Sequence, residues 1–451
     1  MTPLGAVFTL IFSAGVFCLP RRAATVAIIA GVCYVTQGQV LDVGFHFTAI
    51  RLALLAGLIR VVARGELRSL QPNAMDRALL AYALVVTVIP VIRSGTVDEL
   101  VYQVGCLYNI LLFYFVLRCL IKDKEDVRAV LARLAFVIIP FALLMMLESM
   151  TERNLFSVFG GVSESSMIRD GHVRSEGAFR SPITAGAFGA TFAMLFAGML
   201  FAKSERRNAT VGLVASIVIV VCAHSSGPLL GLMFGLIGLI CWNFRHYMRH
   251  IRWGIVLSLV ALSMVMKAPV WFLMGRISDV VGGGGYDRAE VVDAFVKHFD
   301  SWWLLGTSST GGWVATELSF GGTDLTNQFV ADGVNGGLLG LILSVALVVR
   351  CFQRVGRSIR QIEGSNPNEQ KFIWGLGSAL LGSVVIIFSV TYFDQMQVVW
   401  YFLLSCIACE LVPNQAFSVA PADVEDASTA PAAVREAEGC SPAVTSKTLS
   451  I

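Results

Sequence analysis

Apolar runs of about 20 residues alternate with short polar segments along the first 412 residues of the chain. A helical run of that length spans the hydrocarbon core of a bilayer. The pattern therefore predicts an all-α polytopic integral membrane protein with about 12 or 13 transmembrane helices. The predicted helices cover residues 3–19, 23–36, 44–62, 75–92, 100–121, 128–148, 182–202, 209–223, 228–243, 253–273, 326–349, 372–393 and 397–412.

The basic residues of the connecting loops favour one side of the membrane. If the loop with Arg21 and Arg22 is cytoplasmic, six basic clusters with 20 Lys and Arg residues share that side, and nine lie on the other. Such an excess marks cytoplasmic loops. We therefore expect the long loops 149–181 and 274–325 to face away from the cytoplasm. The five further clusters lie at residues 60–68, 118–128, 203–207, 245–252 and 350–371.

Composition agrees with a membrane protein and excludes several functions. Apolar residues make up 56% of the chain and charged residues 14%, and the net charge of +3 gives no reason to expect a nucleic-acid partner. The ten cysteines avoid the long loops, so no disulfide is expected there. No nucleotide-binding or metal-binding motif occurs, so we expect no cofactor and no metal. Residues 413–451 lack an apolar period and predict a disordered cytoplasmic tail behind the membrane domain 1–412.

The first long loop concentrates arginines immediately before a predicted helix. Arg169, Arg174 and Arg180 lie within 12 residues, and Pro182 then begins a helix rich in small residues. Guanidinium groups bind phosphate bidentately, and a helix N-terminus offers free N–H groups to an anion. An anion site is one interpretation. The other is that these arginines reach lipid phosphates or pair with acids of the same loop, such as Glu176.

The second long loop contains an apolar pattern of helical period. Val292, Phe295, Val296, Phe299 and Trp303 recur at three- and four-residue spacing. They predict an amphipathic helix in the membrane interface, anchored by tryptophans 302 and 303. Its polar face includes residues 288, 290, 293, 297 and 298.

The chain then enters the membrane again through a span with unusual polar residues. Asp332 is a carboxylate inside an otherwise apolar run, and Asn327 lies near its outer end. Such residues usually face the interior of a helix bundle or a cavity. Polar contacts between helix ends and a functional role both remain open for them.

The order of these motifs resembles the O-antigen ligase and O-antigen polymerase superfamily. The first loop ends in Arg-x-x-Gly-x-Phe-x-x-Pro, from Arg174 to Pro182. The second has Gly-Arg at 275–276, Arg288 at the head of an aromatic helix, Leu-Gly-Thr at 305–307, and Thr-Asn-Gln-Phe at 326–329 before the glycine-rich helix 336–340. The resemblance covers roughly residues 100–410.

This resemblance implies a metal-independent, inverting glycosyltransferase with a class C membrane fold in the bacterial inner membrane. Such enzymes act at the outer face on glycans linked to polyprenyl diphosphate, and arginines hold the diphosphate. The matching positions here are Arg174, Arg180, Arg276 and Arg288. The family further implies a flippase and a chain-length regulator as partners, beside membrane lipid.

The chain departs from the ligase pattern at the residue before the asparagine, where ligases have a histidine and this sequence has Thr326. We therefore expect polymerisation of lipid-linked repeat units into exopolysaccharide or O-antigen. The candidates for the catalytic base are Asp324 and Glu176. Two alternatives remain: ligase-type transfer to another acceptor, and a lipid-linked oligosaccharide transporter, for which Arg51 and His46 are the charges expected within the bundle.

Overall fold

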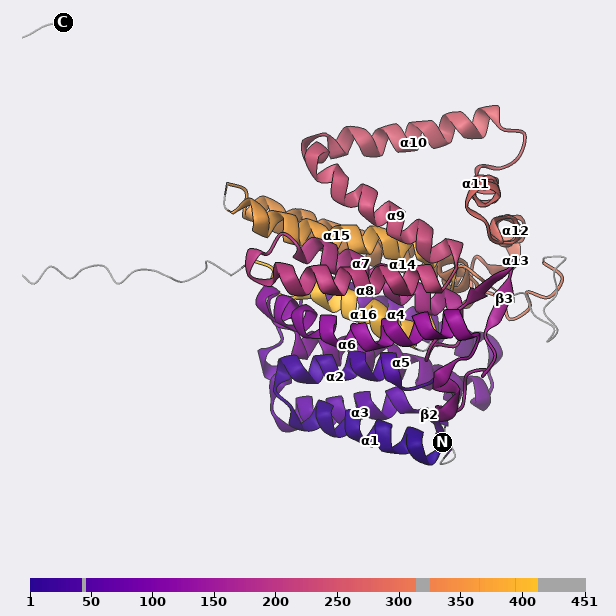
Figure 1. The fold of residues 1–451 in the computed structure, drawn as a ribbon. Coiled ribbons are helices and arrows are strands. Elements are labelled where there is room, and N and C mark those ends of the chain that lie inside the picture. The colour runs from indigo at the N-terminus through magenta and orange to yellow at the C-terminus, as the bar shows by residue number, and fades with distance from the viewer. Residues whose placement is uncertain (43–45, 314–324, 365, 394, 413–451) are drawn as a thin grey trace, which may run out of the picture. The chain divides into compact units, whose positions relative to one another are not determined.

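The structure is a computed structural model that describes residues 1–42, 46–313, 325–364, 366–393 and 395–412. These described residues belong to one unit of the chain, Met1–Val412. The expected tail 413–451 lies outside them. Each of the 13 predicted helices corresponds to a helix of the structure (Figure 1). They are α1 (Pro3–Cys18), α2 (Arg21–Tyr34), α3 (Ala49–Ala63), α4 (Ala74–Ser94), α5 (Val97–Leu120), α6 (Lys124–Thr151), α7 (Pro182–Met199), α8 (Arg206–Cys222), α9 (Ser226–Ile240), α10 (Met248–Val265), α14 (Gln328–Gln361), α15 (Pro367–Ile387) and α16 (Gln395–Ala408).

Shorter elements connect these helices. Two antiparallel hairpins pair β1 (Val40–Asp42) with β2 (His46–Thr48), and β3 (Met167–Arg169) with β4 (His172–Arg174). The second long loop forms α11 (Leu273–Val281), α12 (Gly285–Lys297) and α13 (Phe299–Trp302). Short 3-10 helices are η1 (Glu66–Ser69), η2 (Leu155–Phe159), η3 (Lys203–Glu205), η4 (Cys241–Tyr247) and η5 (Val270–Phe272).

Seven helices of the described residues are long and apolar enough to cross a membrane, as expected for a multi-pass membrane protein. They are Ala74–Ser94, Val97–Leu120, Lys124–Thr151, Pro182–Met199, the run Ser226–Val265, Gln328–Gln361 and Pro367–Ile387. The helices α1 and α16 are apolar but shorter. At 1.5 Å per residue, the 14 residues of α2 measure about 21 Å, less than the hydrocarbon core. The expected count of 12 or 13 spans therefore stays a prediction.

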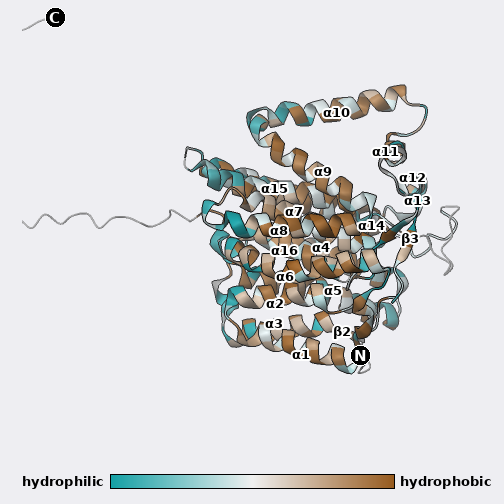
Figure 2. Ribbon diagram, in the orientation of Figure 1, coloured by the Kyte–Doolittle hydropathy of each residue, from teal (hydrophilic) through white to brown (hydrophobic). Residues whose placement is uncertain are grey.

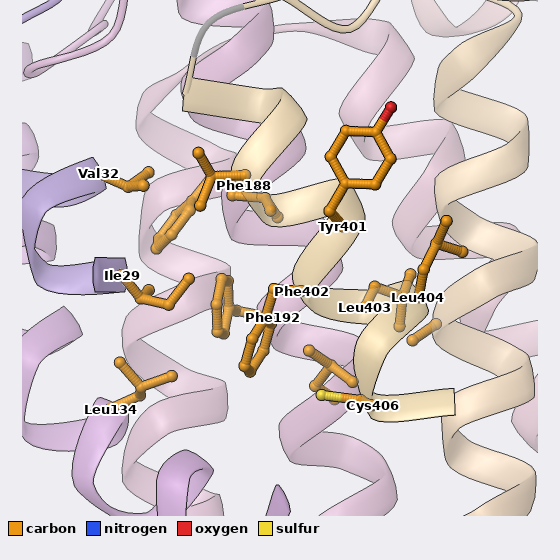
Figure 3. Packing of buried hydrophobic residues seen from close by; sticks show 14 of the residues in the cluster. Ile29, Val32, Leu134, Phe188, Phe192, Tyr401, Phe402, Leu403, Leu404 and Cys406 are labelled. Atoms are coloured by element: carbon orange, nitrogen blue, oxygen red, sulfur yellow. The ribbon is translucent and has the colours of Figure 1, made fainter. Parts of the chain in front are cut away.

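Helix α7 lies at the centre of the helix bundle. Every residue of α7 except Ile183 is buried. Figure 3 shows Phe188 and Phe192 of α7 beside Phe402 of α16, and the rings of Phe192 and Phe402 stack at 5.7 Å between centroids. Small residues allow neighbouring helices to come close: a Cβ atom on Gly198 would lie 2.9 Å from the Cα of Gly375 in α15.

One end of the bundle gathers the clusters expected in cytoplasmic loops. Arg21 and Arg22, at the start of α2, each pair with Asp126 of α6 at 2.6 Å. Arg64, after α3, donates to the carbonyl of Phe17 in α1 at 2.9 Å. The first three clusters therefore lie together.

The other three clusters join the same end. Glu369 of α15 pairs with Lys124 and Arg128 of α6, each at 2.8 Å. Lys371 lies over the ring of Phe201, next to the fourth cluster. Arg245 lies 4.4 Å from the ring of Trp242, which packs edge-on against Trp374 of α15. We call this the basic end of the bundle; its polar loops are visible at the left of Figure 2.

The opposite end, here the hairpin end, carries both β-hairpins and helices α11–α13 (Figure 1). The helix predicted over 44–62 begins only at Ala49. Residues 46–48 pair with strand β1, and the N–H of Ala49 donates to the carbonyl of Gln39 at 2.9 Å. β-Branched and aromatic residues in this stretch favour the extended form.

The amphipathic helix of the second loop is present, but its buried face differs from the prediction. Trp302 is 2% exposed and stacks on Phe295 at 3.9 Å, and the pair packs against Val330 and Val334 of α14. The prediction that Trp302 anchors the helix in the membrane interface was wrong, because this ring is buried in the protein interior. Trp303 is 45% exposed.

Helix α14 is interrupted at Gly337, which has φ +62° and ψ −165°. The segment after α13 forms hydrogen bonds with the backbone groups that lose their partners within the helix at this break. The N–H of Leu338 donates to the carbonyl of Trp303, and the N–H of Thr307 to the carbonyl of Val334, both at 2.8 Å. A broken helix within a membrane domain requires such partners.

Candidate functional site

The candidate site begins with the hairpin β3–β4 at the hairpin end. Asp170 and Gly171 form its turn, with φ values of +52° and +76°. An Asp-Gly pair with positive φ at both positions is typical of the tightest hairpin turn. This turn brings Arg169 opposite His172, and Met167 opposite Arg174.

The hairpin packs against the connection between α8 and α9. The N–H of Ser175 donates to the carbonyl of Cys222 at 3.0 Å. The rings of His172 and His224 stack, with centroids 5.0 Å apart and planes at 8°. His224 has a φ of +40°, which is unusual for a side-chain-bearing residue and turns the chain towards α9.

Three arginines from two distant segments interact at this site. Arg174 is only 8% exposed, and Arg288 of α12 is half-buried. Burial lowers the pKa of Arg288, the carboxylate of the preceding Asp287 raises it in part, and the nearby positive charges of Arg169 and Arg174 lower it further. Burial and the charge of Arg169 likewise lower the pKa of Arg174. The structure thus places three like charges within electrostatic range of one another.

Asp287 and Asp170 lie near enough to act on Arg288 and Arg174, but neither forms an ion pair with them in the described part of the chain. No ion pair there includes Arg174 or Arg288, and the Nε atom of Arg174 has no hydrogen-bond partner. Asp170 pairs with Arg169 at 3.7 Å. A buried guanidinium that forms no ion pair costs free energy, and an anion paired with Arg174 would lower that cost.

The first turn of α9 lies beside this cluster. A Cβ atom on Gly283 would collide with the Oγ of Ser226, so the segment that leads into α12 runs against the start of α9. The N-cap residue Ser225 forms no side-chain cap hydrogen bond. Free N–H groups and the positive end of the helix dipole therefore add to the positive potential.

Two of the four predicted phosphate-binding arginines do not join the cluster. Arg180 is exposed, and its guanidinium lies 5.7 Å from the ring of Phe393. Arg276 is exposed on α11. Among the described residues, neither takes part in the charge interactions that join Arg169, Arg174 and Arg288. Arg169, which the resemblance did not select, belongs to the cluster.

The structure describes only one of the two candidate bases. Asp324 lies outside the described residues. Glu176 is half-buried; burial, together with the nearby carboxylate of Glu148, raises its pKa to about 7. Such a value suits a general base. Its carboxyl group interacts with the side chain of Asn154 and the backbone of Ser163.

Asn327 and Asp332 have structural partners. Asn327 caps α14 by accepting hydrogen bonds from the N–H groups of the second and third residues that follow it. Asp332 accepts from Tyr82 of α4 at 2.9 Å and from Gln328 at 2.8 Å. Asp332 thus makes a polar contact between helices, whereas Asn327 caps its own helix.

The sequence interpretation overlooked Glu148. This glutamate near the end of α6 is 1% exposed and holds the loop that carries Arg174. A carboxylate close to the end of an apolar span needs donors from a neighbouring segment, and that was the signal available in the sequence.

Neither a search for metal ligands nor a comparison with known proteins assigns a further role to this site. Among the described residues, no group of three or more His, Cys, Asp or Glu side chains is placed to hold a metal ion. No family model matches the sequence, and no curated protein matches it.

Proposed function

We propose that this protein is a membrane glycosyltransferase that polymerises glycan repeat units carried on polyprenyl diphosphate. The observation that carries the proposal is the cluster of Arg169, Arg174 and Arg288, unpaired at Arg174 and Arg288 among the described residues and located at the hairpin end. A diphosphate carries the charge and the oxygens that such a cluster binds best.

The proposed chemistry is a direct displacement at the anomeric carbon. The bond between this carbon and the diphosphate oxygen breaks while an acceptor hydroxyl forms the new glycosidic bond with inversion. The hydroxyl proton passes to a base, and the negative charge that develops on the leaving diphosphate is stabilised by the arginines. Glu176 and Asp324 remain the candidates for the base.

The position of the cluster suits a lipid-linked substrate. The arginines lie next to the ends of apolar helices, so a long apolar tail can remain in the bilayer while the diphosphate reaches the cluster. We further propose that the hairpin end faces away from the cytoplasm of the bacterial inner membrane. A flippase that delivers repeat units and a chain-length regulator are proposed partners.

The proposal is tested by reconstituting the purified protein in vesicles with polyprenyl-diphosphate repeat units and reading product length on a gel. We expect a ladder of longer lipid-linked glycans. Replacing Arg174 or Arg288 by alanine should lower its rate of formation by about 100-fold or more, the size seen when one transition-state donor is removed. Arg153→Ala is the matched control, because Arg153 is 73% exposed and pairs with Glu164 on the same loop.

Other outcomes would overturn the polymerase proposal. Transfer of a single glycan to a different acceptor, without elongation, would indicate a ligase. Movement of the lipid across the vesicle membrane without a longer product would indicate a transporter. Arg51, one of the charges on which a transporter would depend, donates to Asn109 of α5 at 2.8 Å, which gives it a role in joining helices.

A further inference from the structure

The hairpin that carries Arg174 is held at both ends by one buried carboxylate. Glu148 of α6 accepts from the Oγ of Ser166 at 2.9 Å, directly before β3. It also accepts from the N–H groups of Glu176 at 3.0 Å and Gly177 at 2.9 Å, directly after β4. The three donors bring the two ends of the hairpin to a single side chain.

This carboxylate has no cation beside it. Glu148 is 1% exposed, and no ion pair of the described residues includes it. Its charge is therefore balanced by backbone and hydroxyl donors alone. Such hydrogen bonds to a charged acceptor are among the stronger ones in proteins. The hydrogen bonds of this buried carboxylate thus all go to the two ends of the hairpin.

The three hydrogen bonds that Glu148 accepts, here called the clamp, act on the arginine cluster through a short stretch of chain. Arg174 is separated from Glu176 by Ser175 alone. Ser175 adds two fixed contacts, from its Oγ to the carbonyl of Met145 at 3.0 Å and from its N–H to the carbonyl of Cys222. The backbone that carries Arg174 is therefore held in place on both sides of this residue.

We infer that Glu148 is a positioning residue, which holds Arg174 where it acts together with Arg288 on the anionic ligand. The inference rests on the proposed function only in the identity of that ligand, a diphosphate. A loosened hairpin would leave both arginines present but without a fixed separation, and binding of a rigid diphosphate depends on that separation.

The test uses Glu148→Gln. The amide keeps the size of the side chain but has only one oxygen, so in either orientation its NH2 group meets a donor of the clamp. Other hydrogen bonds hold the loop in place, including Asn154 Nδ2 to the carbonyl of Gly177 at 2.9 Å, so we expect the variant to fold. Glu152→Gln is the control, because Glu152 is exposed and directly follows the same helix.

The measurement is calorimetric binding of inorganic pyrophosphate to the purified full-length protein in detergent. We expect about tenfold weaker binding for Glu148→Gln, the size of one lost hydrogen bond to a charged group, and no change for Glu152→Gln. Adding Glu148→Gln to Arg174→Ala should weaken binding no further, because the clamp acts through Arg174.

The outcomes separate this inference from the proposed function. If the wild type binds pyrophosphate, Arg174→Ala weakens binding and Glu148→Gln does not, the positioning role is overturned and the anion site stands. If the effects of Glu148→Gln and Arg174→Ala add, Glu148 acts on the fold in general and the inference is again overturned. If Arg174→Ala and Arg288→Ala leave binding unchanged, the anion site itself is wrong.

Discussion

Asp126 is a fully buried carboxylate whose charge is met by Arg21 and Arg22, each at 2.6 Å. Arg174 is nearly as buried, yet no described acid forms an ion pair with it; Arg288 also forms none, although it is only half-buried. Buried charge is costly unless it is compensated. The contrast within one molecule shows that Asp126 is compensated by the fold itself, whereas Arg174 is not, and this difference supports the proposed anion site.

Glu176 gives a prediction about pH. Its pKa is 4.5 in the unfolded chain and about 7 in the folded protein. Between these values the folded protein binds the proton more tightly, so this contribution to stability is complete below pH 4.5 and is lost as the pH rises through 7.

We therefore expect the melting temperature of the wild type to fall between pH 5 and pH 8. Glu176→Gln, which cannot ionise, should remove about 2 kcal/mol of that pH dependence. Thermal unfolding in detergent across the range measures it, with Glu164→Gln as an exposed control from the same loop. Equal pH dependence in the wild type and Glu176→Gln would show that Glu176 keeps an ordinary pKa.

Single residues of the site differ in how far the sequence reveals them. Arg174 stands out because an arginine in a loop away from the basic clusters needs a local reason. Arg169 and Arg180 satisfy the same rule, and the sequence offers no means to tell that, of these two, only Arg169 acts electrostatically on Arg174. The clamp of Glu148 depends on contacts across 18 to 29 residues, which no local pattern encodes.

Among the elements, the broken helix α14 shows where periodicity misleads. The apolar pattern predicts a helix over 326–349, and the structure has a helix there, but Gly337 interrupts it. Both halves of α14 are apolar, and the hydropathy pattern does not show that one residue between them has a positive φ. The same holds for α12 and α13, where helical spacing located the helix but both tryptophans were expected in the membrane interface, although Trp302 is buried.

Gly337→Ala tests the break. The position has a φ and ψ that residues with a side chain avoid, and a Cβ atom would lie 2.5 Å from the carbonyl oxygen of Leu304. We expect a loss of about 2 kcal/mol or more in stability, read as a lower melting temperature. Gly254→Ala in α10 is the control, since a Cβ atom there meets no atom within 4 Å. A melting temperature equal to that of the wild type would mean that α14 is continuous in solution.

At the scale of the whole described unit, contacts draw the six basic clusters together although they are scattered over 350 residues of sequence. The sidedness of loop charge was a prediction from alternation alone, and it agrees with one basic end. What the fold leaves open is the direction in which this end points. The positive-inside rule predicts that the basic end faces the cytoplasm, and the proposed function requires this orientation.

Labelling of intact cells with a membrane-impermeant maleimide measures the direction. Glu164 at the hairpin end and Glu125 at the basic end are matched acids, with side chains 68% and 56% exposed. The long loops contain no native cysteine, so the wild type should stay unlabelled in intact cells; Cys18, which is exposed, and Cys440 are replaced by serine in both variants so that they do not react after disruption. We expect Glu164→Cys to react in intact cells and Glu125→Cys to react only after disruption. The reverse pattern would place the arginine cluster in the cytoplasm, where a polymerase supplied by a flippase has no substrate, and the proposed function would then fail together with the orientation.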